Sequence, residues 1–451
     1  MNYKERYSLN KKRGFKDFPD IKARYTCHFC GACVVVCPTQ CLLPATPGHE
    51  KIIWDRERCI CCSLCFKVCP GREVDYPQLD KRMSPPGKNS YHYDSEMGNF
   101  LTNYIGYSKW EDIRRRGTSG GVITTMLLYL LERKEIDGAI VVGFKKDAPW
   151  LPETKLSRRS QEIIAAAQSK YAIFSHLSIL KQIEREQGRF ALVALPCQIN
   201  GLKKMEPYRP RLKKKIAYIF GVFCGYNMVY EATEFVRKKF GIQKKDIKEL
   251  RYRDGLWPGG MTFYLKDGSI KRIDDFHYHY LNAVFLPHRC RYCWDFFAQY
   301  ADLSFGDCWL PELYTGKSEE NRGWSSIIVR TPKGDSLVMQ AIEDKWIVAR
   351  EVSKEKVKES FPSMLKYKKR GVFVRMILHP YSPRLVGIRK PKIPLAEYPY
   401  HVLYYMVLLI GGSKIFKWVI NLFSLPRLRW AITLFKGIMR HPHDARNKVL
   451  K

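Results

Sequence analysis

The sequence has few acidic side chains for its size, and it has no long apolar run. Its 451 residues include 44 Asp and Glu against 78 Lys and Arg, a formal net charge of +34. Such a surplus attracts polyanions such as nucleic acid, anionic lipid or a phosphorylated partner. No run approaches the roughly 20 apolar residues that cross a bilayer, and the opening segment MNYKERYSLNKKRGFKDF contains no apolar leader. We therefore expect a cytoplasmic protein rather than a secreted or integral membrane protein.

Dense basic clusters of the kind that bind nucleic acid are also missing. The runs RRR (114–116), KKK (213–215) and KKR (368–370) are short and isolated, whereas nucleic-acid surfaces combine clustered basic residues with stacking aromatics. Nucleic acid is therefore not an expected partner. A hydrophobic content of 45% excludes a disordered chain.

Cysteine, by contrast, is abundant and confined to two regions. Ten of the 15 cysteines lie between Cys27 and Cys69, and five lie between Cys197 and Cys308. A disulfide scaffold is not expected in a long chain without a secretory leader. The spacing C-x3-C-x2-C of radical enzymes that use S-adenosylmethionine is absent, which argues against radical initiation by a cluster.

The first region contains the pattern C-x2-C-x2-C-x3-C-P twice, which is the pattern of two-cluster bacterial ferredoxins. In those proteins the fourth cysteine of each run binds the cluster of the other run. Zinc sites, the alternative, usually use paired C-x2-C units. We assign one [4Fe-4S] cluster to Cys27, Cys30, Cys33 and Cys69, and a second to Cys59, Cys62, Cys65 and Cys37. Cys41 and Cys61 fall outside the pattern and are expected to be small packed side chains.

The rest of the chain alternates predicted helices with buried strands. Strands are expected at 137–144, 190–195 and 215–223, helices at 120–134, 159–168 and 175–187, and a hairpin at 262–273. This alternation predicts an α/β body with a mostly parallel sheet.

The predicted domains follow from composition. Residues 1–77 form a small α+β two-cluster ferredoxin domain, 78–100 a polar linker, 101–350 the α/β body, 351–392 a connecting segment, and 393–451 a helical extension.

The second group of cysteines is scattered. Cys197 and Cys224 follow predicted strands, at the sheet edge where doubly wound folds place their sites. Cys290, Cys293 and Cys308 come later. Spacing alone leaves two interpretations open: a third cluster, or ordinary core cysteines.

Several motifs together resemble one family, the beta subunit of coenzyme F420-reducing hydrogenase and of F420-linked formate dehydrogenase, and also plant 7-hydroxymethyl chlorophyll a reductase. The matching segments, in order, are SGGVITTML (119–127), AAAQSKY (165–171), LPCQINGL (195–202), GVFCGYN (221–227), CRYCWD with ADLSFGD (290–307), and NRGWSSIIVRT (321–331). The resemblance covers about residues 101–350.

The resemblance implies a flavin-binding body with one FAD and a third [4Fe-4S] cluster beside it. The implied cluster ligands are Cys197, Cys224, Cys290 and Cys293, with Cys308 as the alternative. The implied FAD contacts are Ser119, Gly120 and Gly121 at the pyrophosphate, Lys170 and Tyr171 at the flavin, and Gln198, Asn227, Trp324 and Ser325 lining the pocket. The plain alternatives are an ordinary glycine-rich helix start and a solvated surface lysine.

The implied function is that of an iron–sulfur flavoprotein oxidoreductase. FAD would exchange a hydride with reduced F420 or another hydride carrier, and the clusters would exchange single electrons with a redox protein partner. Hydride transfer requires no general acid or base, so no catalytic side chain is predicted. Two alternatives remain: an electron-transfer subunit of a larger complex, or a reductase of surface-polysaccharide metabolism in an organism without F420.

The last 59 residues differ in character from the rest. From residue 393 onward nine Lys and Arg accompany two acids, within segments rich in Trp, Phe, Leu and Ile. Basic amphipathic helices of this kind bind anionic membrane surfaces, here the inner face of the membrane. The alternative is that they pack on the α/β body or on a partner chain.

Overall fold

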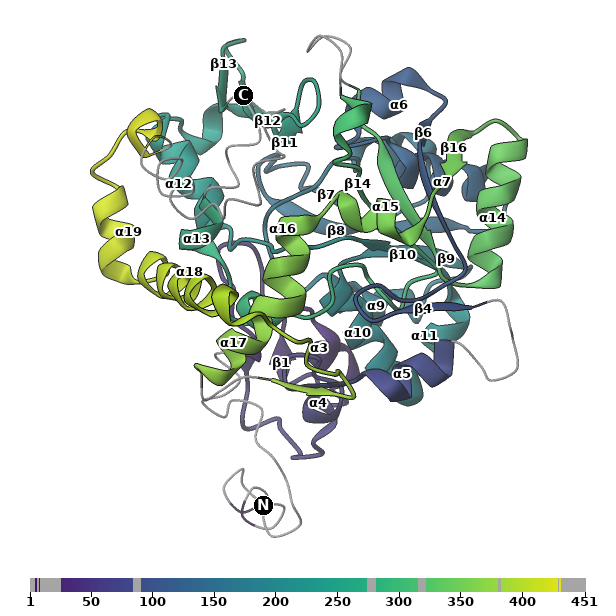
Figure 1. Cartoon of the computed structure of the whole chain (residues 1–451), viewed down its shortest axis with the longest axis horizontal. Coiled ribbons are helices and arrows are strands. Elements are labelled where there is room, and N and C mark those ends of the chain that lie inside the picture. The colour runs from purple at the N-terminus through teal and green to yellow at the C-terminus, as the bar shows by residue number, and fades with distance from the viewer. Residues whose placement is uncertain are drawn as a thin grey trace.

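The computed structural model describes residues 26–83, 91–273, 281–314, 322–379 and 383–428, together with Glu5, Ser8 and Trp430. Its centre is an eight-stranded sheet with the order β16-β6-β15-β14-β10-β9-β7-β8 (Figure 1). The strands are β6 Thr102–Ser108, β7 Gly138–Phe144, β8 Pro152–Ser157, β9 Phe190–Ala194, β10 Ile216–Val222, β14 Leu303–Asp307, β15 Ser325–Val329 and β16 Ile347–Glu351.

The sheet is mixed, so the prediction of a mostly parallel sheet is wrong. The four inner strands β7, β9, β10 and β14 are parallel, but the other four pairings are antiparallel. A short return at residues 145–151 brings β8 back beside β7, and β15 runs against both β14 and β6. The parallel pair β9 and β10 still ends at one edge, where Cys197 and Cys224 follow.

Helices cover both faces of the sheet because strand side chains alternate between the faces. Ile140 and Leu192 join a core with α9 (Leu180–Ile183) and α10 (Pro196–Met205). Val141 and Ala191 join a second core with α7 (Val122–Glu132) and α14 (Pro332–Glu343). The α/β architecture is thus confirmed.

The two cysteine runs fold in the same way. Each has two residues with positive φ at matching positions, Phe29 (56°) and Gly31 (90°) in the first run and Cys61 (56°) and Ser63 (61°) in the second. A short helix follows each turn, α3 (Ala32–Val36) and α4 (Leu64–Lys67). The region also contains β1 (Leu42–Leu43), β2 (Ile53–Trp54) and β3 (Glu73–Asp75).

The cysteine-rich segment is built into the body. Val35 and Val68 belong to the same buried cluster as Leu177 and Leu202 of the α/β body. Gly201 shows how close the approach is, since a Cβ there would lie 3.2 Å from Cys30 Sγ. Residues 26–77 therefore share the core of the larger body.

Two predicted connecting segments turn out to be structured. Within 78–100, α5 (Tyr76–Met83) and the hairpin β4 (His92–Asp94) and β5 (Gly98–Phe100) replace the expected linker, and residues 84–90 lie outside the described part. The polar composition concealed buried anchors, among them Met97 and Phe100.

Residues 351–392 form α15 (Lys354–Glu359), α16 (Pro362–Leu365), the π-helical turn η8 (Lys366–Arg370), α17 (Gly371–Ile377) and β17 (Arg384–Val386). Strand β17 pairs in parallel with β3, so this segment closes over the cysteine-rich region instead of merely connecting domains.

The remaining elements frame the body. The predicted hairpin at 262–273 is observed as β12 (Gly260–Leu265) and β13 (Ile270–Ile273), beside β11 (Ile247–Asp254). The other elements used below are α6 (Glu111–Arg116), α8 (Ser160–Ala165), α12 (Glu231–Lys239), η5 (His288–Tyr292), α18 (Tyr398–Gly411) and α19 (Lys414–Ile420). The last two begin the predicted helical extension, and residues 431–451 lie outside the described part.

Candidate functional site

The first run of cysteines is joined by Cys69 of the second run. Burial raises the pKa of Cys27, and the neighbouring charges of Cys69 and Cys30 raise it further. Burial likewise raises the pKa of Cys30 to about 12, again with Cys69 as a neighbouring charge. The same two causes act on Cys33. Each of Cys27, Cys30 and Cys33 thus has others of these four thiols (the first group) as neighbours; Cys30 and Cys33 are buried, and Cys27 and Cys69 are half-buried.

The second group contains Cys37 of the first run. Burial raises the pKa of Cys65 to about 12, and the charges of Cys62, Cys59 and Cys37 add to this effect. All four line one cavity with Trp54. The structure thus brings the fourth cysteine of each run close to the first three cysteines of the other run. The assignment of each such set of four to one cluster stays a prediction.

Cys41 and Cys61 have closer neighbours than the sequence indicated. Cys41 is buried, lines the cavity of the second group, and its Sγ lies 3.4 Å from Cys37 Sγ. The backbone N–H of Cys61 donates to Cys59 Sγ at 3.4 Å, and Phe29 N–H donates to Cys27 Sγ at 3.3 Å. Both turns therefore direct backbone donors at a thiol.

The third group assembles from three separate places in the fold. Cys197 lies in the first turn of α10, Cys224 follows β10, Cys290 lies in η5, and Cys293 comes just after it. Burial raises the pKa of Cys197 well above its usual value, with Cys293, Cys224 and Cys290 as neighbouring charges.

Cys308 lies apart from the third group. It is fully buried beside Ser360, with Sγ 3.7 Å from Ser360 Oγ. It also packs with Ile105 and Leu310 in a separate cluster.

Lys368 is a member of the site that the sequence analysis missed. It lies in η8 and is 1% exposed. Burial opposes its charge, but the thiolates of Cys293, Cys224 and Cys290 raise its pKa above that of an ordinary lysine. The signal in the sequence was the run KKR (368–370), which composition alone does not distinguish from a solvated surface run.

The three groups form a series. Cys30 of the first group is one of the neighbouring charges that raise the pKa of Cys197. In the same way Cys33 of the first group has Cys65 of the second as a neighbour. Cys62 at the far end is exposed. The thiols thus lead from the centre of the fold to the surface.

Thiolates are the usual protein ligands of iron–sulfur clusters, and buried hydrogen-bond donors surround these groups. His28 Nδ1, Arg289 Nη1 and Trp294 Nε1 are buried without a partner in the described structure. Each lies within one residue of a grouped cysteine in the sequence, and donors to cluster sulfur are a means of tuning a cluster. Across the described ranges, no three His, Cys, Asp or Glu side chains meet as a site for a single metal ion. Cysteine thiols with buried N–H donors beside them are the donor chemistry that iron–sulfur clusters use.

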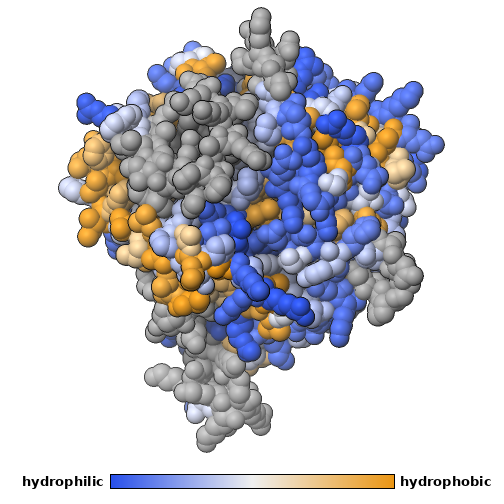
Figure 2. Space-filling view, in the orientation of Figure 1, coloured by the Kyte–Doolittle hydropathy of each residue, from blue (hydrophilic) through white to orange (hydrophobic). Residues whose placement is uncertain are grey.

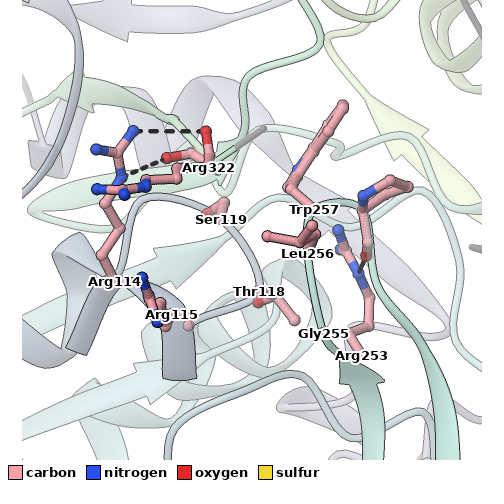
Figure 3. A pocket seen from close by; sticks show the side chains of 12 residues that line it. Arg114, Arg115, Thr118, Ser119, Arg253, Gly255, Leu256, Trp257 and Arg322 are labelled. Carbon is pink, nitrogen blue, oxygen red and sulfur yellow. Dashed lines mark hydrogen bonds between the residues drawn. The ribbon is translucent and has the colours of Figure 1, made fainter. Parts of the chain in front are cut away.

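A basic pocket borders the glycine-rich turn that precedes α7 (Figure 3). It is lined by Arg114, Arg115, Gly117, Thr118, Ser119, Arg253, Gly255, Leu256, Trp257, Pro258, Arg322 and Gly323. Arg114 is held by carbonyls, with Nε donating to Gly323 O at 3.1 Å and Nη2 to Arg322 O at 3.4 Å. Arg253 pairs with Asp307 at 2.6 Å. Glu111 pairs with both Arg115 and Arg322, at 2.7 and 2.9 Å. Four guanidinium groups therefore face two acids, and this surplus suits an anionic ligand.

The glycine-rich turn borders this pocket and packs against β15. Ser119 Oγ lies 3.0 Å from Ser325 Oγ, and Gly120 N–H donates to Ser325 Oγ at 3.0 Å. A Cβ on Gly120 would lie 2.5 Å from Gly106 O, which explains the glycine. Gly121 precedes α7 with φ 73°. The expected pyrophosphate contacts of Ser119, Gly120 and Gly121 stay predictions, as does the pocket-lining role of Ser325.

Lys170 and Tyr171 take different positions. Lys170 Nζ donates to the carbonyls of Ala166, Ala167 and Gln168 at 2.5–3.0 Å, at the end of α8. Tyr171 is hydrogen-bonded to Arg253 of the basic pocket. Tyr171 thus contacts one residue of that pocket, and the expected flavin contacts of Lys170 and Tyr171 stay predictions.

Gln198 and Asn227 lie at the third group of cysteines. Gln198 Oε1 accepts from Leu195 N–H at 2.8 Å and so caps the helix that carries Cys197. The backbone N–H of Asn227 donates to the thiol of Cys290. These contacts position cysteines rather than line the basic pocket.

Trp324 lies near that pocket, with its ring packed edge-on against Tyr107 at 4.6 Å and Arg114 over both rings.

Tyrosines connect the pocket to the third group. Burial raises the pKa of Tyr226, and Tyr171 and Cys224 are among the charges that raise it further. Tyr171 also contacts Arg253 of the pocket. A chain of neighbouring side chains therefore leads from the pocket to the cysteines, through Arg253, Tyr171, Tyr226 and Cys224. The two parts of the site are therefore linked through Tyr171 and Tyr226.

Fold and site together define an α/β protein with three thiol groups in series and a basic pocket, an arrangement suited to oxidation–reduction chemistry. The N-terminal model of the coenzyme F420 hydrogenase/dehydrogenase beta subunit matches residues 103–181, and the C-terminal model matches residues 187–355. The chain belongs to this family of oxidoreductases. Both matches begin after the first cysteine region.

Named relatives extend the comparison. The coenzyme F420-dependent sulfite reductase of Methanocaldococcus jannaschii is 31% identical over 335 residues, 71% of this chain but 46% of that protein, so the chain spans less than half of it. The coenzyme F420 hydrogenase subunit beta of Methanothermobacter thermautotrophicus is 29% identical over 238 residues, 51% of this chain and 78% of that subunit. A chain of the F420-reducing [NiFe] hydrogenase complex from Methanosarcina barkeri aligns with a TM-score of 0.49 at 21% identity, covering 66% of this chain and 99% of that one.

Proposed function

We propose that this oxidoreductase passes electrons between a hydride carrier, reduced F420 or a similar molecule, and a one-electron redox protein. The single observation that carries the proposal is the series of three thiol groups from the basic pocket to the exposed Cys62. The F420-linked names of the relatives support the choice of carrier.

The basic pocket would hold the phosphates of FAD. Ser119 and Gly121 would contribute backbone N–H groups, and Arg115, Arg253 and Arg322 would contribute positive charge. FAD supplies the exchange between a two-electron hydride and single electrons. The protein positions the carrier and excludes water, and Tyr171 and Tyr226 occupy the space between pocket and cysteines.

Each thiol group would hold one [4Fe-4S] cluster, with the ligands assigned from the sequence. Lys368, fixed by η8, would offset the negative charge of the third cluster. The buried donors Arg289 and Trp294 would stabilise cluster sulfur in the same region.

The electron exit would lie at the second group. A groove beside Cys37 is lined by Arg158, Lys181, Arg185 and Arg209 against two acids, Glu184 and Glu186. Two of these cations are paired with those acids, which leaves Lys181 and Arg185 as the surplus. A positive rim around an exit suits an acidic carrier protein.

A second candidate function is that of an electron-transfer subunit inside a larger complex, because the hydrogenase relatives are named as subunits.

The test is an anaerobic titration of the cofactor-loaded chain with reduced F420. Two absorbance changes are measured: the rise of oxidised F420 and the bleaching of the flavin. The proposal predicts both changes without any added protein. Reduction by NADH but not by F420 would reject the carrier, and reduction only after addition of a second subunit would favour the complex.

A further inference from the structure

The surface of α18 and α19 is apolar on the side that faces away from the body. The exposed residues are Val402, Leu403, Met406, Leu409 and Ile410 on α18, Ile415 and Trp418 on α19, and Leu422, Phe423 and Trp430 beyond it. Figure 2 shows this apolar surface along the edge where Figure 1 places the two helices. We call these ten residues the apolar edge.

The apolar edge is distinct from the face of α18 that packs on the core. Helix α18 already buries one stripe against the body, made by His401, Tyr405, Leu408 and Gly411. Tyr405 Oη lies 2.9 Å from Tyr292 Oη, and Arg291 Nη2 donates to Leu408 O at 2.8 Å. A soluble helix carries polar residues on its outer face, but α18 carries leucine, methionine and isoleucine there. A patch of this kind marks an interaction surface.

Neither α18 nor α19 alone is long enough to cross a bilayer. No single helix in the described part of the chain has the length and hydropathy of a span, and α18 with its preceding turn meets α19 at an angle of 77°. At about 1.5 Å per residue α18 is roughly 21 Å long, against a hydrocarbon core of about 30 Å. The two helices have the length and hydropathy of a span only when taken together. The 77° bend between them and the stripe that α18 buries against the body favour a pair that lies along a surface.

The charge of this segment identifies the occupant. Between Glu397 and Asp444 the sequence has no Asp or Glu in 46 residues, but it has six Lys and Arg. Lys414 and Arg427 are exposed beside the apolar edge, and Trp418 is 64% exposed. Tryptophan and basic residues around an apolar strip match the interface of an anionic bilayer. We propose that α18 and α19 dock the protein on the surface of an anionic membrane, with the apolar edge in the headgroup region.

The test is co-sedimentation of the full chain with phosphatidylcholine vesicles that contain about 30 mol% phosphatidylglycerol, compared with pure phosphatidylcholine vesicles. The affinity should fall at least about tenfold without the anionic lipid, since each nearby Lys or Arg adds to the attraction. The double variant Ile415→Ser with Trp418→Ser should lose about tenfold or more on anionic vesicles. Both side chains are largely exposed (77% and 64%), so the fold should persist.

The matched control is Ile270→Ser with Met339→Ser, two exposed apolar residues on β13 and α14, and it should bind as the unmodified chain does. Absence of binding to anionic vesicles would overturn the proposal, as would full binding by the double variant. A dimer in sedimentation equilibrium without lipid that the double variant converts to monomer would also overturn it, because the apolar edge would then be a protein interface. None of these readouts depends on the redox function.

Discussion

Replacing Lys368 by Met should lower the reduction potential of a cluster held by the third group of cysteines. Lys368 is buried beside Cys293, Cys224 and Cys290, so its charge favours the state that carries one more electron. At a separation on the order of 7 Å and an effective dielectric constant of about 20, the interaction is roughly 2 kcal/mol. For a one-electron couple this corresponds to about 100 mV. Methionine has a similar length and fills the space without the charge.

The assay is a redox titration of the cofactor-loaded protein followed by electron paramagnetic resonance. Lys368→Arg keeps the charge and should keep the potential close to that of the unmodified protein. Lys358→Met is the control, because Lys358 pairs with Asp94 and Glu96 and lies on α15. An unchanged potential in Lys368→Met with full iron content would refute the electrostatic role.

Three further predictions concern the thiols, the exit and acid stability. Cys197→Ala or Cys293→Ala should remove about four iron atoms per chain. Cys308→Ala and Cys41→Ser should leave the iron content unchanged. Iron analysis that shows a loss in Cys308→Ala or Cys41→Ser would mean that a ligand was assigned wrongly. Cys62→Ala should leave reduction of flavin intact but abolish electron transfer to an external acceptor protein, and stopped-flow traces with full acceptor turnover would place the exit elsewhere. Burial lowers the pKa of His176 to about 4, and its Nε2 donates to Val193 O at 2.9 Å. In the unfolded chain the pKa is about 6.5, so between pH 6.5 and 4 the unfolded chain binds the proton more tightly than the folded chain does. The free energy of unfolding should therefore fall over this range, by up to about 3 kcal/mol. Urea unfolding at pH 7 and 5 should show a smaller loss in His176→Gln, and an equal loss would contradict the assignment.

The sequence was most informative where spacing is a local constraint. Two runs of C-x2-C-x2-C-x3-C-P require the same tight turn, and the matching φ values of Phe29 and Cys61 reflect that requirement. The predicted strand ends before Cys197 and Cys224 placed these two residues at one edge of the sheet, but their spacing left a third cluster and core cysteines both open.

The sequence was least informative where polar residues are buried. Lys368 and Lys369 looked like surface residues, yet burial among thiolates and beside the ring of Trp294 (4.1 Å) makes them part of the core. The segment 78–100 looked like a linker because few buried apolar residues anchor it, among them Leu79, Met97 and Phe100. The mixed sheet could not be predicted, since strand order depends on contacts between residues far apart in the chain.

The central claim is that three clusters and one flavin lie in series in this chain. Iron, zinc and flavin analysis of anaerobically prepared, cofactor-loaded protein tests it most directly. We predict about twelve iron atoms and one FAD per chain, from three cubanes of four irons each. A value near eight iron atoms would remove the third cluster, and about two zinc atoms in place of iron would contradict the account as a whole.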